Sequence, residues 1–205
     1  DFAGVPVSMV IYYFATRNFN YDYEPKFYTF SLLTLWLVLG DLFFGVSHVI
    51  FHKVEYLWKN HHSIHHEYKL ENLTCFANFY SDFLDANVMT ITLTIPIVVL
   101  ANFFEFEICY FLFIDTIFVA SNTHNKYCNN HVTTCFFFEY DLLDQLFGKM
   151  VGCKQISEFH HHHHVSTNKN YGATGVIKDD ILIYLAETIM NLFGIKKRSE
   201  ENHEE

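Results

Sequence analysis

The chain has 205 residues, which suffices for one domain with a sizeable interior but is short for two ordinary ones. Hydrophobic residues make up 51% of it and charged residues only 18%, which excludes a disordered chain and favours a membrane protein. The formal charge of -10, with 13 basic residues of which few are arginine, argues against a nucleic-acid-binding protein, because such a protein needs a basic face.

Long apolar stretches predict helices that cross a membrane. The stretch 29–50 carries a single charge, Asp41, and as a helix it would reach about 33 Å, the hydrocarbon thickness of a bilayer. Residues 86–104 form a second span without charges, and residues 108–121 return across the bilayer after a short turn. The apolar piece 3–14, in a chain that does not begin with Met, is expected to be the remainder of a truncated first span.

The positions of the basic residues predict the orientation of these spans. Only Arg17 and Lys26 lie between the first two spans, so the rest of the 13 basic residues lie on the opposite side. By the positive-inside rule that side is cytoplasmic, and every His lies at or beyond a cytoplasmic span end. We therefore expect one domain over residues 1–205, an all-α integral membrane bundle of about four spans, with a cytosolic helical layer that carries the histidines.

The cysteines and the last residues indicate the environment of the chain. Five Cys form an odd set without a C-x-x-C pair, which favours a reducing compartment over a disulfide framework. The charged run from 196 to 205 is expected to be a solvated, disordered tail. The phenylalanines at 136–138 and the leucines that follow them are typical of a helix at the membrane surface.

Two groups of His follow the 29–50 span at helical spacing. His48 and His52 are four residues apart, so they share one face of a helix and can reach one metal ion. Asp41 lies seven residues before His48 on that face, and we expect it to accept a hydrogen bond from a ligand imidazole. Ten residues after His52 an H-x-x-H-H motif adds three candidates: His62, His65 and His66. His61 is left out of the ligand set.

A third box lies in the run from His160 to His164, which has the same H-x-x-H-H spacing. Its ligand candidates are His160, His163 and His164, with His161 and His162 as fillers, although the run could also be read as a purification tag or a low-complexity tract. Four ligands complete one structural zinc site, so three boxes together suggest two metal ions. Imidazole suits iron, copper or zinc better than magnesium or calcium, and paired iron beside a bilayer suits oxygen chemistry.

Two His lie between the second and third boxes. His124, Cys128, His131 and Cys135 share one helical face and could alternatively form a separate zinc site. Whether His131 or Cys128 is a ligand stays open, whereas His124, just beyond the last span, is included among the candidates.

The boxes resemble those of the fatty acid hydroxylase and sterol desaturase superfamily. The stretch Gly40 to His52 ends in H-x3-H, and about ten residues later H-x-x-H-H is followed by Glu67 and Tyr68, whereas the acyl-CoA desaturases separate such boxes further. After the third box, Asn170-Tyr171-Gly172 and Asp179 lie where sterol methyl oxidases carry Asn-Tyr and Asp. The resemblance covers about residues 30–180, and it also includes His124 as the lone His of the family.

This resemblance implies a four-span enzyme of the endoplasmic reticulum or a bacterial inner membrane that hydroxylates or desaturates a lipid, either a sterol or a fatty acyl or sphingolipid. It implies two iron ions, which zinc can replace in a purified sample, and electrons from cytochrome b5 or a similar donor. The alternative is a non-catalytic metal-binding membrane protein or a decayed homologue, because Asn125-Lys126-Tyr127 departs from the family's Ser/Thr-Gly-Tyr.

Overall fold

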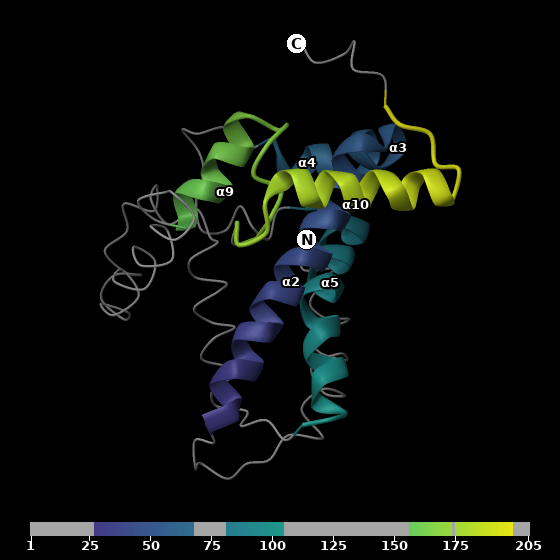
Figure 1. Cartoon of the computed structure of the whole chain (residues 1–205). Coiled ribbons are helices and arrows are strands. Elements are labelled where there is room, and N and C mark those ends of the chain that lie inside the picture. The colour runs from purple at the N-terminus through teal and green to yellow at the C-terminus, as the bar shows by residue number, and fades with distance from the viewer. Residues whose placement is uncertain (1–26, 68–80, 105–155, 174, 199–205) are drawn as a thin grey trace.

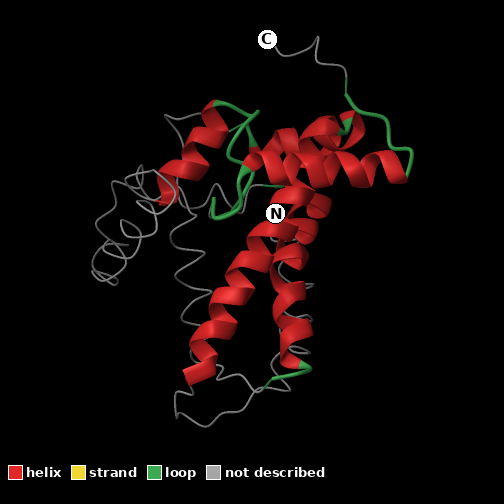
Figure 2. Cartoon of the chain, viewed as in Figure 1, coloured by secondary structure: helices red, strands yellow, loops and turns green. Residues whose placement is uncertain are grey.

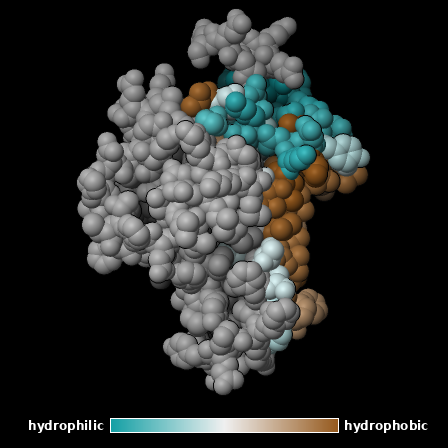
Figure 3. Space-filling view, turned by 60° about the vertical axis from the view of Figure 1, so that its left-hand side comes forward, coloured by the Kyte–Doolittle hydropathy of each residue, from teal (hydrophilic) through white to brown (hydrophobic). Residues whose placement is uncertain are grey.

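The computed structural model describes residues 27–67, 81–104, 156–173 and 175–198, and all regular structure in these ranges is helical. Two long helices lie side by side, and shorter helices form a layer across one end of the pair (Figures 1 and 2). Hydrophilic side chains gather on this layer and hydrophobic ones on the long helices below it (Figure 3). The spans expected at residues 3–14 and 108–121, and the surface helix expected after residue 136, lie outside the described residues.

Helices α2 (Phe27–Lys53) and α5 (Phe83–Ala101) are the two long helices, and they confirm the spans expected at 29–50 and 86–104 as helices. Both are long and apolar enough to cross a membrane, over Thr34–Lys53 and Phe83–Leu100. Only 41% and 29% of these stretches is buried within the protein, whereas the core helix of a soluble protein would be mostly buried. The span count of four is not tested by the part of the chain that the structure describes.

Local interactions explain where α5 begins and how it packs on α2. The side chain of Asp82 caps α5 by accepting a hydrogen bond from the backbone N–H of Leu84 at 2.8 Å. Trp36 on α2 donates its indole N–H to the carbonyl oxygen of Leu93 at 2.9 Å. The helices are in contact at this level, and a Cβ at Gly40 would lie 3.7 Å from Leu93, an ordinary van der Waals distance.

Three short helical segments follow α2 and carry the second His box. They are α3 (Glu55–Leu57), η1 (Trp58–His62) and α4 (Ser63–His65). The middle one, η1, is a π-helix, a rare and wider turn that is found mostly at functional sites. The third box lies on α9 (Ile156–Val165).

Helix α10 (Asp179–Leu192) lies across the end of the α2–α5 pair (Figure 1). It buries Leu182, Ala186 and Met190, which recur every four residues and therefore form one face. This face packs on α2 so closely that a Cβ at Gly45 would lie 2.5 Å from a methyl carbon of Leu182. Glycine at 45 is therefore what allows the two helices to touch.

The residues after α10 return to the end of α2, which differs from the solvated tail expected from residue 196 onward. The backbone N–H of Arg198 donates to the carbonyl oxygen of Lys53 at 2.7 Å, and its guanidinium lies 5.2 Å above the ring of Trp58. Lys53 and Lys197 both form ion pairs with Glu187. Contacts with α2 and η1 thus hold residues up to Arg198, and residues 199–205 are outside the described part.

Candidate metal centre

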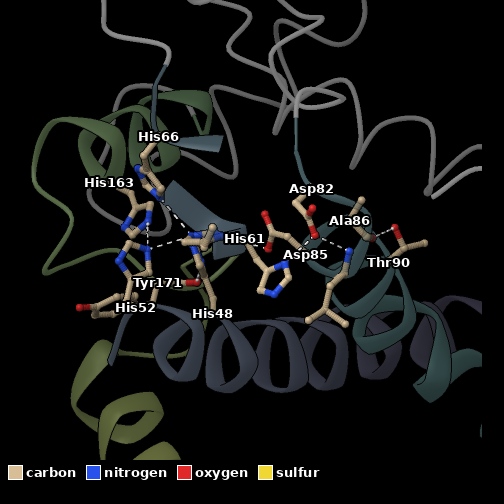
Figure 4. A network of polar contacts seen from close by, with 12 residues as sticks. His48, His52, His61, His66, Asp82, Asp85, Ala86, Thr90, His163 and Tyr171 are labelled. Atoms are coloured by element: carbon tan, nitrogen blue, oxygen red, sulfur yellow. Dashed lines mark hydrogen bonds and ion pairs between the residues drawn. The ribbon is translucent and has the colours of Figure 1, made fainter. Parts of the chain in front are cut away.

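Five His side chains from four segments converge at the junction of the long helices and the upper layer. One ring nitrogen from each of the five His lies within 4.8 Å of the corresponding nitrogen of every other (Figure 4). The Nε2 atom of His62 lies 2.9 Å from that of His48, 3.0 Å from that of His52 and 3.1 Å from that of His66. The Nε2 atom of His163, from the third box, lies 3.0 Å from that of His52. The structure thus brings one or two members of each of the three boxes to one point.

These separations fit a metal site better than a set of hydrogen bonds. Two nitrogens bound to one ion at about 2.1 Å lie about 3.0 Å apart at a right angle and about 3.4 Å apart in a tetrahedron. Hydrogen bonds would require each ring to give its single proton to several neighbours at once, which a neutral imidazole cannot do. A nitrogen-rich donor set of this kind suits iron, copper or zinc.

The opposite ring nitrogens of three of these His have acceptors that fix the tautomer. Nδ1 of His48 lies 2.8 Å from the carbonyl oxygen of Tyr171, and Nδ1 of His163 lies 2.6 Å from that of Lys169. Carbonyl oxygens only accept, so each Nδ1 carries the proton and each Nε2 presents a lone pair to the cluster. The same holds for His62, whose Nδ1 lies 3.0 Å from the carboxylate of Asp85.

The loop that supplies the Tyr171 carbonyl is itself held by a carboxylate. Asp179, the first residue of α10, accepts hydrogen bonds from the backbone N–H groups of Asn170 and Tyr171. Asn170 has a positive φ of 59°, a conformation that Asn tolerates better than most residues, and its side chain donates to the carbonyl oxygen of Phe159. The Asn-Tyr and Asp of the family resemblance therefore have a structural role: they hold the oxygen that orients His48.

Asp41 supports the same loop from α2. It is fully buried and accepts a hydrogen bond from the backbone N–H of Ile177 at 2.9 Å. A Cβ at Gly172 would lie 3.0 Å from this carboxylate, so the glycine lets the loop lie directly on it. A contact between a ligand-candidate imidazole and a carboxylate is made at Asp85, which our sequence analysis missed.

Two neighbouring His meet two carboxylates at the start of α5. His62 pairs with Asp85, whereas His61 turns outward and its Nδ1 lies 2.7 Å from Asp82 (Figure 4). The sequence signal for this arrangement is the spacing of Asp82 and Asp85, three residues apart and therefore on one face of the first turn of α5. His61 lies outside the cluster, as we expected.

The model of the fatty acid hydroxylase family matches residues 33–183, a range that contains all three His boxes. The chain belongs to the fatty acid hydroxylase family. No curated protein and no solved structure matches the chain. Members of this family are oxidoreductases that act on lipids, so the chain is an oxidoreductase of this family whose substrate class is a lipid. The family and the two apolar helices also indicate that the chain is associated with a membrane.

The remaining candidate ligands lie beside the cluster or outside the described residues. The rings of His65 and His164 are 4.7 Å apart between centroids, and His164 lies 4.5 Å from His66. His162 is exposed, in agreement with its reading as a filler. The side chains of His160 and His161, and the whole of His124, Cys128 and His131, lie outside the described part.

Burial keeps two of the candidate ligands, His163 and His66, neutral. Removal from water lowers the pKa of His163 to about 3, and the neighbouring His62 and His65 lower it further. Burial also lowers the pKa of His66 well below its usual value, again assisted by His62. Because neutral imidazole is the metal-binding form, the site is prepared for a cation before any ion arrives.

Aromatic rings shield the cluster from water. Trp58 lies 4.7 Å from His52 and 5.4 Å from His66, and Tyr171 lies 5.4 Å from His163, all between ring centroids. Burial raises the pKa of Tyr171 to about 12, with a further contribution from Asp179, so its phenol stays protonated at neutral pH. Such a shell limits solvent access to bound metal.

Proposed function

We propose that this member of the fatty acid hydroxylase family is a membrane-bound non-haem di-iron oxygenase that hydroxylates or desaturates a lipid, with O2 and electrons from a redox partner. The observation that carries the proposal is the convergence of five imidazoles, three of which have Nε2 atoms oriented by an acceptor at Nδ1. They lie at one end of two helices that are apolar enough to cross a membrane. An acyl chain or sterol in the bilayer is thereby close to the site.

We infer that two ions are bound rather than one. Five nitrogens already exceed the four ligands of a tetrahedral site, and His65 and His164 lie within ring contact of His66. The proposed ligands are therefore the five clustered His together with His65, His164, His124 and His160. Iron is the metal that matches the family, and zinc can take its place in a purified sample.

The residues of this chain hold the metal ions and orient their ligands, and they do not themselves react with the substrate. The carbonyls of Tyr171 and Lys169 and the carboxylate of Asp85 keep three Nε2 atoms directed at the ions, while Trp58 and Tyr171 exclude water. Bound iron would supply the activation of O2 that is needed to remove hydrogen from an unactivated C–H bond. Hydroxylation adds one oxygen atom to the lipid, whereas desaturation removes a second hydrogen from the neighbouring carbon.

Isotope labelling tests the function directly. Membranes that contain the full chain are supplied with electrons and ¹⁸O2, and their lipids are compared by mass spectrometry with membranes that contain His163→Ala or His162→Ala. We expect a new lipid product in the wild type and in His162→Ala but none in His163→Ala, since only His163 lies in the cluster. Label in the product identifies hydroxylation, and loss of two hydrogens without label identifies desaturation. Equal product from His163→Ala and the wild type would contradict the proposal.

We further propose that the His boxes lie on the cytosolic side of the endoplasmic reticulum or of a bacterial inner membrane, where cytochrome b5 or a similar donor can reach them. The asymmetry of basic residues supports this orientation. The acceptor Asn72-Leu73-Thr74 then stays unmodified in a eukaryotic secretory system, whereas an acceptor engineered between Arg17 and Lys26 is glycosylated. A gel shift that disappears in Asn72→Gln would place the boxes in the lumen.

A further inference from the structure

Helix α10 has more apolar surface than the described part of the chain covers. Its buried face consists of Leu182, Ala186 and Met190. A second apolar stripe adjoins this face at the same four-residue spacing and remains accessible: Ile181, Leu185, Ile189 and Leu192. Ile181 is 50% exposed and Leu192 is 78% exposed. A surface helix that packed only on its own protein would need one apolar stripe of about 100° and would present polar residues elsewhere.

The charged residues of α10 occupy the remaining side. Asp180 and Glu187 are seven residues apart and therefore share a face, and Asn191 continues it one turn later. Glu187 is engaged there by Lys53 and Lys197. The exposed Tyr184 lies between this polar face and the outer apolar stripe, and tyrosine is enriched at such positions in membrane interfaces. The helix thus has an inner apolar side, an outer apolar side and a polar side.

The place of α10 in the fold puts the outer stripe at the level of the membrane surface. The helix touches α2 from Gly45 to Lys53, which is the last part of the stretch Thr34–Lys53 that can span a membrane. Phe43, two residues before Gly45, is itself 46% exposed on α2. The apolar surface of the spanning helix therefore continues to the depth at which α10 crosses it (Figures 1 and 3).

We propose that the outer stripe of α10, formed by Ile181, Leu185, Ile189 and Leu192, lies in the lipid of the membrane surface. The lipid fits better than a second protein, because α10 packs on the last part of the stretch of α2 that can span a membrane, and because the stripe contains no charged residue that would specify a partner. The helix would then hold Asp179, and through it the loop that orients His48, at a fixed depth in the bilayer. This requires that α2 and α5 lie in a membrane, but it does not require oxygenase activity.

Site-specific fluorescence in vesicles tests this placement. An environment-sensitive fluorescent amino acid is incorporated at one position of the full chain, which is reconstituted in phosphatidylcholine vesicles with or without lipids brominated near the headgroup end of their acyl chains. Two matched pairs of sequence neighbours are compared: Leu192 with Asn191, and Ile181 with Asp180. Thermal unfolding of each labelled chain serves as the check that the fold is intact.

We expect blue-shifted emission at 181 and 192, which brominated lipid quenches about twofold, because the stripe would lie in the outer acyl region. At 180 and 191 we expect emission that is neither shifted nor quenched. The emission should not depend on the protein-to-lipid ratio. Blue-shifted emission without quenching, or a shift that disappears on dilution of the protein in lipid, would mean that protein covers the stripe. Water-like emission at all four positions would mean that nothing covers it. Either result would overturn the proposal, whether or not the chain oxidises a lipid.

Discussion

The Nδ1 atom of His62 lies 3.0 Å from Oδ1 of Asp85, and the side chains of both residues are almost completely buried. The two residues belong to η1 and to the first turn of α5, so the second long helix sets the orientation of a central candidate ligand. The Nε2 atom of His62 lies within 3.1 Å of the Nε2 atoms of three other His, and its carboxylate partner fixes the tautomer that directs this nitrogen to the cluster. Asp85 therefore contributes to the metal centre without lying in any His box.

Replacement of Asp85 should weaken metal binding. Asp85→Asn keeps the size of the side chain but removes the charge that fixes the His62 tautomer, and we expect about 10- to 100-fold weaker metal retention against a chelator. The matched control is Asp82→Asn, because Asp82 pairs with His61 outside the cluster and Asn also caps a helix well. Equal retention by the two variants would contradict the role given to Asp85.

The contact between α2 and α10 should depend on Gly45. A Cβ at this position would lie 2.5 Å from one methyl carbon of Leu182, which is completely buried and has little room to move. We expect Gly45→Ala to lower the free energy of unfolding by about 1–3 kcal/mol, measured by denaturation in detergent. Gly40→Ala is the control in the same helix, since its Cβ would lie 3.7 Å from Leu93. A smaller loss for Gly45→Ala than for Gly40→Ala would argue against this packing.

The His boxes could be predicted because helical spacing alone places His48 with His52 and His62 with His66. Their convergence could not, since it depends on the π-helical turn of η1 and on the way α9 meets α2. The contact of Asp41 with Ile177 could not be predicted either, since it depends on a loop far away in the sequence. Helix α10 was missed although its apolar residues recur at helical spacing from Ile181 to Leu192, a signal that the sequence does carry.

The C-terminal residues should contribute to the wall of the site. The guanidinium of Arg198 lies over Trp58, and Trp58 packs on His52 and His66. We expect Arg198→Ala to lower the free energy of unfolding by about 0.5–2 kcal/mol, through the lost cation–π contact and the lost interaction with Glu55. Lys196→Ala, which changes an exposed side chain, should have no measurable effect. Equal melting temperatures of the two variants would show that the end of the chain is dispensable.

The metal-free protein should lose stability in acid. Burial lowers the pKa of His163 from 6.5 to about 3, so the folded state stays neutral where the unfolded state takes up a proton. The free energy of unfolding is therefore not reduced by this residue above about pH 6.5. Between about pH 6.5 and about 3 it decreases as the pH falls, because protonation then favours the unfolded chain. The lowered pKa of His66 acts in the same direction. Denaturation of chelator-treated protein at a series of pH values checks this, and stability that is unchanged or higher at about pH 5 than at about pH 7 would contradict it.

The metal content of two neighbouring variants on α9 tests the central claim most directly. His163 is completely buried with its Nε2 atom 3.0 Å from that of His52, whereas His162 is exposed. The full chain, purified from iron-supplemented cells, is analysed for metal ions per polypeptide as wild type, His163→Ala and His162→Ala. We predict about two ions per chain for the wild type and for His162→Ala, and a large loss for His163→Ala, because removal of a ligand opens the site. Wild-type metal content in His163→Ala would contradict the assignment of the five converging histidines as a metal centre.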